Sequence, residues 1–86
     1  MVEKVFTTRM LLGNTVTVIC KNGQRVAGTM LEFFERNNAI AIKDFVIFDK
    51  NENGEWECVE KGDLIILKGD AWAELICKKF AGKLGD

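Results

Sequence analysis

Two short polar stretches carry the side chains best suited to molecular recognition in this chain. Residues 36–38 read Arg-Asn-Asn between two apolar runs, and residues 68–70 read Lys-Gly-Asp after another. An asparagine amide offers donors and an acceptor, so it can read the edge of an unstacked base, and a lysine can meet a phosphate. The simpler alternative for Asn37-Asn38 is a turn, because asparagine tolerates left-handed backbone geometry. The residues alone favour the turn.

Residues that support catalysis or metal binding do not form a recognisable set. Histidine is absent, and so are Cys-x-x-Cys pairs. A Ser/His/Asp set, a Cys/His pair and a zinc site are therefore not expected, and no glycine-rich loop cradles a phosphate. The carboxylates of Glu32, Glu35 and Asp44 have no evident pairing and are expected to be solvated. We expect a protein that is not an enzyme and that has no metal and no cofactor.

Composition limits the class of protein further. The 86 residues are 48% hydrophobic, which suits one small globular domain with a core. The formal net charge of −1 argues against a protein that coats duplex DNA, so no DNA partner is expected. The sequence has no bilayer-spanning apolar run and no signal-peptide pattern, which predicts a cytoplasmic protein without a membrane partner. Cys20, Cys58 and Cys77 are expected to be reduced, with Cys20 in the core.

Alternating apolar residues predict a meander of β-strands. Strands are expected at Thr15–Cys20 and Arg25–Phe33, joined by a type I′ turn at Asn22-Gly23. Gly28 lies inside the second strand, where it permits a sharp bend or a close crossing. A third strand is expected at Ala39–Phe48.

The fourth strand is expected to run from Glu55 towards Leu67 after a polar turn at residues 50–54. It should be interrupted by a bulge or kink at Lys61-Gly62-Asp63. The run Leu64–Leu67 is apolar at every position, which predicts burial on both faces.

The two ends of the chain are less regular. Residues 3–12 are predicted to form a short amphipathic helix. Residues 71–76 fit a fifth strand, although the apolar spacing from Trp72 to Phe80 also fits a helix, and we choose the strand. Trp56 and Trp72 are expected to serve packing or subunit contacts rather than base stacking. The predicted organisation is one domain over residues 1–86, with a barrel at about 14–76 and a tail at 77–86.

The segment GTMLEFFERNNAIAI resembles the first Sm motif of the Sm and Sm-like proteins. Gly28, Met30, Phe33, Asn38 and Ile40 fall at the family's spacing. The segment IILKGD, residues 65–70, is similar to the second Sm motif, with lysine in place of the arginine of its Arg-Gly pair. The similarity extends over about residues 10–76, including the opening Leu-Gly-Asn and Val-x-Val pattern.

The resemblance implies an all-β fold, a small, strongly bent five-stranded antiparallel barrel (Sm-like, SH3-like) with a short N-terminal helix. It also implies a homo-oligomeric ring of six or seven subunits, in which strand four of one subunit pairs with strand five of the next. The ring would bind single-stranded, U-rich or A/U-rich RNA at its pore, where Asn38 would read a base and Lys68 would reach phosphate. The RNA-binding residues implied are Phe34, Arg36, Asn37, Asn38, Lys68, Gly69 and Asp70.

Four positions depart from the family pattern. Phe34 stands where the family has an aspartate that orients the asparagine, and Asn37 replaces a residue that stacks on a base. Lys68 lacks the planar, bidentate group of arginine. Gly62 lies one residue further from the Lys-Gly pair than its counterpart does. An altered pocket and a negative net charge keep a second hypothesis open, in which a similar ring serves as a protein-interaction scaffold without physiological RNA.

Overall fold

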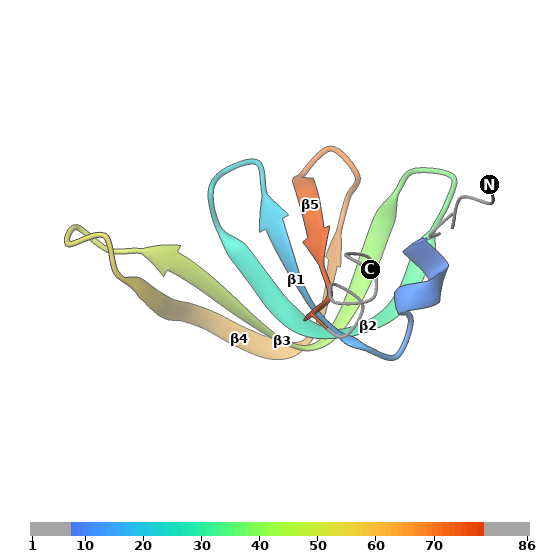
Figure 1. Ribbon diagram of the computed structural model, residues 1–86, viewed down its shortest axis with the longest axis horizontal. Helices are drawn as coiled ribbons and strands as arrows, with labels where there is room; N and C mark the ends of the chain where they lie inside the picture. The colour runs from blue at the N-terminus through green and yellow to red at the C-terminus, as the bar shows by residue number, and fades with distance from the viewer. Residues whose placement is uncertain (1–7, 79–86) are drawn as a thin grey trace, which may run out of the picture.

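The computed structural model describes residues 8–78, which form one five-stranded sheet (Figure 1). The strand order is β4-β3-β2-β1-β5, and all neighbouring strands are antiparallel. This confirms the predicted small all-β fold. The sheet is strongly curved but open, because no pairing joins its edge strands β4 and β5 within the described residues. The elements are η1 (Thr8–Leu11), β1 (Thr15–Cys20), β2 (Arg25–Phe34), β3 (Ala39–Lys50), β4 (Trp56–Leu67) and β5 (Trp72–Ile76).

The predicted strands all form, and their bounds differ from the prediction by at most two residues. The strand interpretation of residues 71–76 is confirmed, since β5 pairs with β1 and leaves no room for a helix there. In the described part of the predicted helix at residues 3–12, the chain forms the four-residue 3-10 helix η1. Residues 3–7, and the tail from residue 79 onward, lie outside the described part of the chain.

The turn between β1 and β2 is not the predicted type I′ turn. Gly23 has φ of 93°, but Asn22 is not among the residues with positive φ. The Gly23 N–H donates to the Cys20 carbonyl at 3.0 Å, and the Cys20 N–H donates to the Gln24 carbonyl at 2.8 Å. These bonds close a three-residue loop, in which one glycine supplies the left-handed conformation. The Asn22 side chain instead accepts the Gln24 N–H at 3.0 Å.

Gly28 occupies the predicted close crossing. The β2–β3 register shifts between Ala27 and Thr29, opposite Asp44, which has φ of 51°. A Cβ atom on Gly28 would lie 2.7 Å from the Lys43 carbonyl oxygen. The backbones therefore approach so closely here that only glycine fits.

The irregularity in β4 lies elsewhere than predicted. Gly62 pairs regularly with Phe45, and the ladder shifts where Cys58 and Glu60 pair with consecutive residues of β3, leaving Val59 without a partner. The bulge is therefore at Val59, and a bulge at residues 61–63 is excluded by the regular pairing there. Gly62 serves the core instead, because a Cβ atom there would lie 2.9 Å from the Phe45 ring.

The core fills the concave side of the sheet. Its fully buried side chains come from β1, β2 and β3, and they are Val16, Val18, Val26, Met30, Ile40 and Ile42. The predicted burial of Leu64–Leu67 on both faces is wrong for the single chain. Leu67 is buried, but Leu64 and Ile66 are 52% and 55% exposed, because within residues 8–78 no second layer covers the other face of β4.

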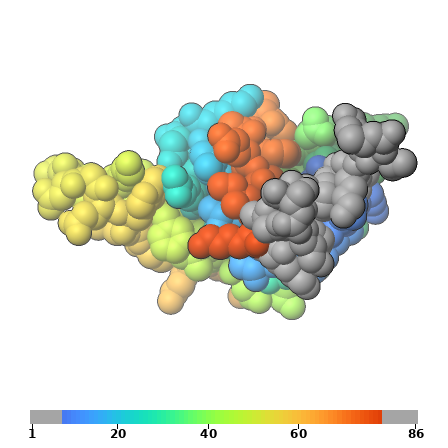
Figure 2. All heavy atoms as spheres, in the orientation of Figure 1, coloured from blue at the N-terminus to red at the C-terminus, as the bar shows by residue number. Residues whose placement is uncertain are grey.

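The β3–β4 hairpin projects well beyond the other strands (Figures 1 and 2). The molecule measures 48 × 27 × 21 Å, and its long axis runs along this projection. We call residues 46–61, the distal half of this hairpin, the arm. Among the described residues, no helix has the length and apolar character needed to cross a bilayer.

Candidate functional site

Two turns that are distant in the sequence meet at one end of the sheet. The turn between β2 and β3 packs on the turn between β4 and β5. A Cβ atom on Gly69 would overlap the Asn37 carbonyl oxygen and lie 2.8 Å from Asn38 Cβ. The Trp72 indole N–H donates to the Asn38 carbonyl at 2.7 Å. We call residues 35–38, residues 68–71 and Trp72 the loop cluster.

The two asparagines hold the first turn. Asn38 has φ of 54°, a left-handed conformation that asparagine tolerates better than most residues. The Asn37 side chain accepts the Ala39 N–H at 3.3 Å and so caps the turn. The turn interpretation is therefore right for the backbone. The Asn38 side-chain amide is exposed and bonds to no other residue among those described, so it remains available to a ligand.

The second turn presents a cation and a carboxylate. The Ala71 N–H donates to the Lys68 carbonyl at 2.9 Å, which closes the turn. The Lys68 and Asp70 side chains are exposed, and neither forms an ion pair within residues 8–78. Lys68 is therefore free to meet an anion at the loop cluster, while Asp70 beside it disfavours a purely phosphate-binding surface.

Phe34 and Arg36 stand at the rim of the first turn. Phe33 is 8% exposed and Phe34 is 44% exposed, so one of the two adjacent phenylalanines leaves the core, as expected from strand alternation. Phe34 pairs with Ala39 directly below the turn, and Arg36 is exposed at its tip. The structure thus brings all seven predicted site residues to one end of the molecule.

Arg9 is a neighbour of this end that sequence patterns did not identify. Its guanidinium donates to the Phe33 carbonyl at 3.2 Å and lies 3.6 Å from the Glu32 carboxylate and 3.9 Å from that of Glu35. These partners lie more than twenty residues away in the sequence, so no local spacing signals the contact. Arg9 ties η1 to the end of β2 and supports the base of the first turn.

The three thiols lie on separate parts of the described chain. Burial raises the pKa of the Cys20 thiol above its ordinary value of 9.0, so it stays protonated. Cys77 is also buried and Cys58 is exposed, and all three are free. In the described part of the chain, no three His, Cys, Asp or Glu side chains gather closely enough to hold a metal ion.

Comparisons with known proteins identify the fold alone. No family model matches the chain, and no curated protein matches it. Among solved structures, the chain is similar to one in a crystal structure of the NatC complex bound to CoA, with a TM-score of 0.69 and 10% sequence identity. The match covers 95% of this chain and 99% of that chain. At this identity the likeness concerns the path of the backbone.

Proposed function

We propose that this chain is an Sm-like subunit of a homo-oligomeric ring that binds single-stranded, U-rich or A/U-rich RNA at its pore, without enzymatic activity. The observation that carries the proposal is the loop cluster. Asn38, from the turn between β2 and β3, meets Gly69 and Trp72 from the far end of the chain. The two segments that resemble the Sm motifs therefore lie against each other, as a shared RNA site requires.

The contact between the turns leaves suitable groups on the surface. The Asn38 carbonyl is occupied by the Trp72 indole, which fixes the turn, while its side-chain amide has no partner among residues 8–78. A fixed backbone with a free amide is suited to reading a base edge, because less conformational entropy is lost on binding. Lys68 would supply the charge, and a ring would repeat both groups in every subunit, which raises the effective concentration.

Ring closure is supported by the edge strands β4 and β5, each of which pairs with one strand only within residues 8–78. β4 carries the exposed apolar side chains Leu64 and Ile66, and β5 carries Ile76, which is 37% exposed. Pairing β4 of one subunit with β5 of the next would satisfy the backbone groups of both edges. It would also bury apolar side chains, each of which contributes about 1.5–3 kcal/mol when fully removed from water.

Light scattering tests the ring. The protein at micromolar concentration should have a mass that is a multiple of 9.7 kDa. Leu64→Lys with Ile66→Lys should give monomers that still fold, because both side chains are already exposed in the single chain. Val59→Lys, at an equally exposed position in the arm, is the matched control and should leave the assembly intact. A monomeric parent protein would overturn the ring.

Fluorescence anisotropy with short oligo-U, oligo-A and oligo-C tests the RNA site. Asn38→Gly removes the amide and accommodates φ of 54°, so it should reduce discrimination among bases without unfolding the protein. Lys68→Gln should weaken binding of all three and lower the salt dependence. The proposal fails if the parent protein binds none of them at tens of micromolar in low salt, or if both variants bind as the parent does.

The second candidate is a protein-interaction scaffold of the same fold. Its supporting observation is the apolar edge of β4, which offers Leu64 and Ile66 to any strand that pairs there. The similar solved chain belongs, by its title, to a protein complex, so this backbone path also occurs within protein assemblies. Binding of a heterologous strand that competes with self-assembly, together with absent RNA binding, would favour this candidate.

A further inference from the structure

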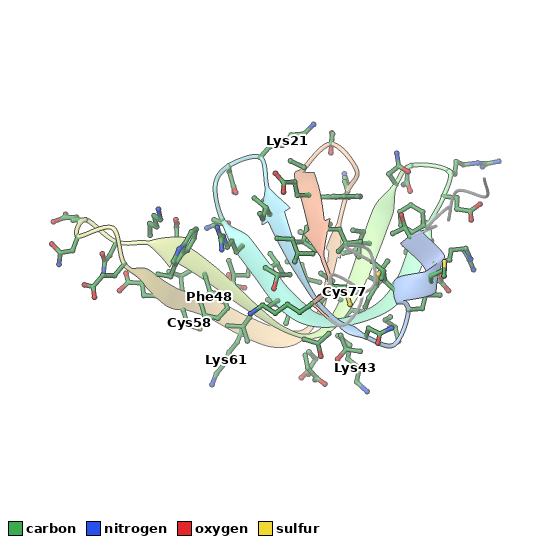
Figure 3. The ribbon with its side chains drawn as sticks, in the orientation of Figure 1. Lys21, Lys43, Phe48, Cys58, Lys61 and Cys77 are labelled. Atoms are coloured by element: carbon green, nitrogen blue, oxygen red, sulfur yellow. The ribbon has the colours of Figure 1, made fainter. Side chains whose placement is uncertain are left out.

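The arm has two chemically different faces. Phe48 of β3 pairs with Arg25 of β2 on one side and with Cys58 of β4 on the other. Two further pairs join β3 to β4, Lys50 with Trp56 and Val46 with Lys61. Because paired residues share a face of the sheet, the cations gather on one side of the arm. We call this side the outer arm face, and its members are Arg25, Val46, Phe48, Lys50, Trp56, Cys58 and Lys61. In Figure 3, Lys61 projects from the convex side of the sheet, as does Lys43 nearer the bend.

The opposite face of the arm is acidic. Asp49 pairs with Glu57, and Ile47 pairs with Glu60, so these carboxylates alternate with the cations along the same two strands. The Gln24 amide donates to the Asp49 carboxylate at 3.3 Å on this side. The outer arm face itself contains three cations and no carboxylate. Residues 46–61 carry five carboxylates and two lysines, so the arm is acidic as a whole and its cations lie together on this one face.

Two of these cations lie close to one aromatic ring. The Arg25 guanidinium carbon is 4.5 Å from the centroid of Trp56, and the Lys50 ammonium is 5.3 Å from it. Trp56 is nevertheless 39% exposed, and Arg25 and Lys50 are exposed beside it. An exposed indole close to a guanidinium and an ammonium offers a stacking surface next to positive charge.

We propose that the outer arm face is a second contact for single-stranded RNA, separate from the loop cluster. Trp56 with Arg25 stacks on a base, while Lys50 and Lys61 meet phosphates. An acidic peptide would use the cations alone, whereas single-stranded RNA also uses the exposed indole. This assignment departs from the packing role that the sequence alone favours for Trp56.

The arm stays accessible in the proposed ring. β5 has five residues and β4 has twelve, so edge pairing between them covers less than half of β4. The exposed apolar residues of that edge, Leu64 and Ile66, lie in the half away from the arm. Trp56 and Lys61 would therefore remain free. The inference extends the proposed function, but its binding chemistry requires neither the ring nor the loop cluster.

Charge-matched variants test the inference. Lys50→Gln with Lys61→Gln should lower the salt dependence of binding to a long oligo-U by about 0.7 in log–log slope for each phosphate that the protein no longer neutralises. Lys21→Gln with Lys78→Gln, which removes the same charge from exposed positions off the arm, should leave the slope unchanged. Trp56→Leu should weaken binding by about tenfold, because the stacking surface is removed. Equal effects of the two double variants would overturn the inference.

Photo-crosslinking of oligo-U followed by trypsin maps the contact directly. Cleavage after Lys50 and Lys61 releases residues 51–61 with Trp56, and cleavage after Lys68 and Lys78 releases residues 69–78 with Trp72. Crosslinks on the first peptide are expected for the arm, even in the Asn38→Gly and Lys68→Gln variants. Their absence, or competition by poly-glutamate as effective as that by oligo-U, would contradict the inference and favour an acidic protein partner. Crosslinks confined to residues 51–61 would instead retain the arm contact and reject the loop cluster.

Discussion

The loop cluster and the arm are both formed by antiparallel strands and their turns, but different contacts hold them. In the loop cluster, Trp72 bonds to Asn38, thirty-four residues earlier, and Gly69 packs against the same turn. In the arm, two adjacent strands pair with one bulge at Val59, and alternation along each strand decides the face on which each side chain lies. The first region depends on long-range packing, so it should be sensitive to small changes in shape. The second is largely exposed and should be sensitive mainly to charge.

The largest difference in the free energy of unfolding between the two regions is expected when one glycine in each is replaced by alanine. Gly69→Ala forces a Cβ atom onto the Asn37 carbonyl and should lower the free energy of unfolding by about 3 kcal/mol. Gly54→Ala, at the tip of the arm, meets no atom within 4 Å and should cost only about 1 kcal/mol, through its φ of 79°. Urea denaturation of both variants measures the two values. Equal losses would show that the loop cluster is not tightly packed.

A smaller difference in stability is expected when the tryptophan of each region is replaced by phenylalanine. Trp72→Phe removes the indole donor of an exposed bond to the Asn38 carbonyl and shortens a side chain that packs against the core, which together should cost about 1–2 kcal/mol. Trp56→Phe keeps an aromatic ring near Arg25 and should cost less than about 1 kcal/mol. Thermal unfolding followed by circular dichroism measures the stability of both variants. A larger loss for Trp56→Phe than for Trp72→Phe would contradict the view that long-range packing holds the loop cluster but not the arm.

The smallest expected effect concerns the thiols. Cys58, in the arm, should react with a thiol reagent at once, while buried Cys20 and Cys77 should react only on unfolding. The folded state keeps the Cys20 proton more tightly than the unfolded state, because its pKa is raised. Its contribution to stability is therefore present below pH 9.0 and is lost as pH rises through the higher folded value. Thiol counting in folded and denatured protein checks the predicted difference in reactivity, and two fast-reacting thiols in the folded protein would contradict it.

Local patterns predicted most of the fold. The alternation of apolar residues predicted the bounds of β1. The position of Gly28 inside a strand predicted a bend or close crossing, and the Lys43 carbonyl oxygen does approach the backbone closely at Gly28. The patterns failed where tertiary contacts decide. Gly62 suggested a kink, yet it makes room for the Phe45 ring, while the bulge falls at Val59, which has no distinctive sequence signal.

The candidate site was predictable only in part. Its seven residues follow from resemblance to the Sm motifs, but the packing of Gly69 on Asn37 follows only from the bent sheet. Arg9 was missed because its partners lie in a distant strand. The outer arm face was missed because residues 46–61 are acidic as a segment, and only the strand register separates Lys50 and Lys61 from the carboxylates on the opposite face.

The central claim is that the loop cluster binds single-stranded RNA. The chain has two tryptophans, so the nitrogen–proton NMR spectrum contains one indole signal for the loop cluster, from Trp72, and one for the arm, from Trp56. Titration with a short oligo-U should shift the Trp72 indole signal and the Asn38 side-chain amide signals first, since the indole bonds the same turn. If neither the Trp72 nor the Asn38 signals move at tens of micromolar oligo-U in low salt, the claim is wrong.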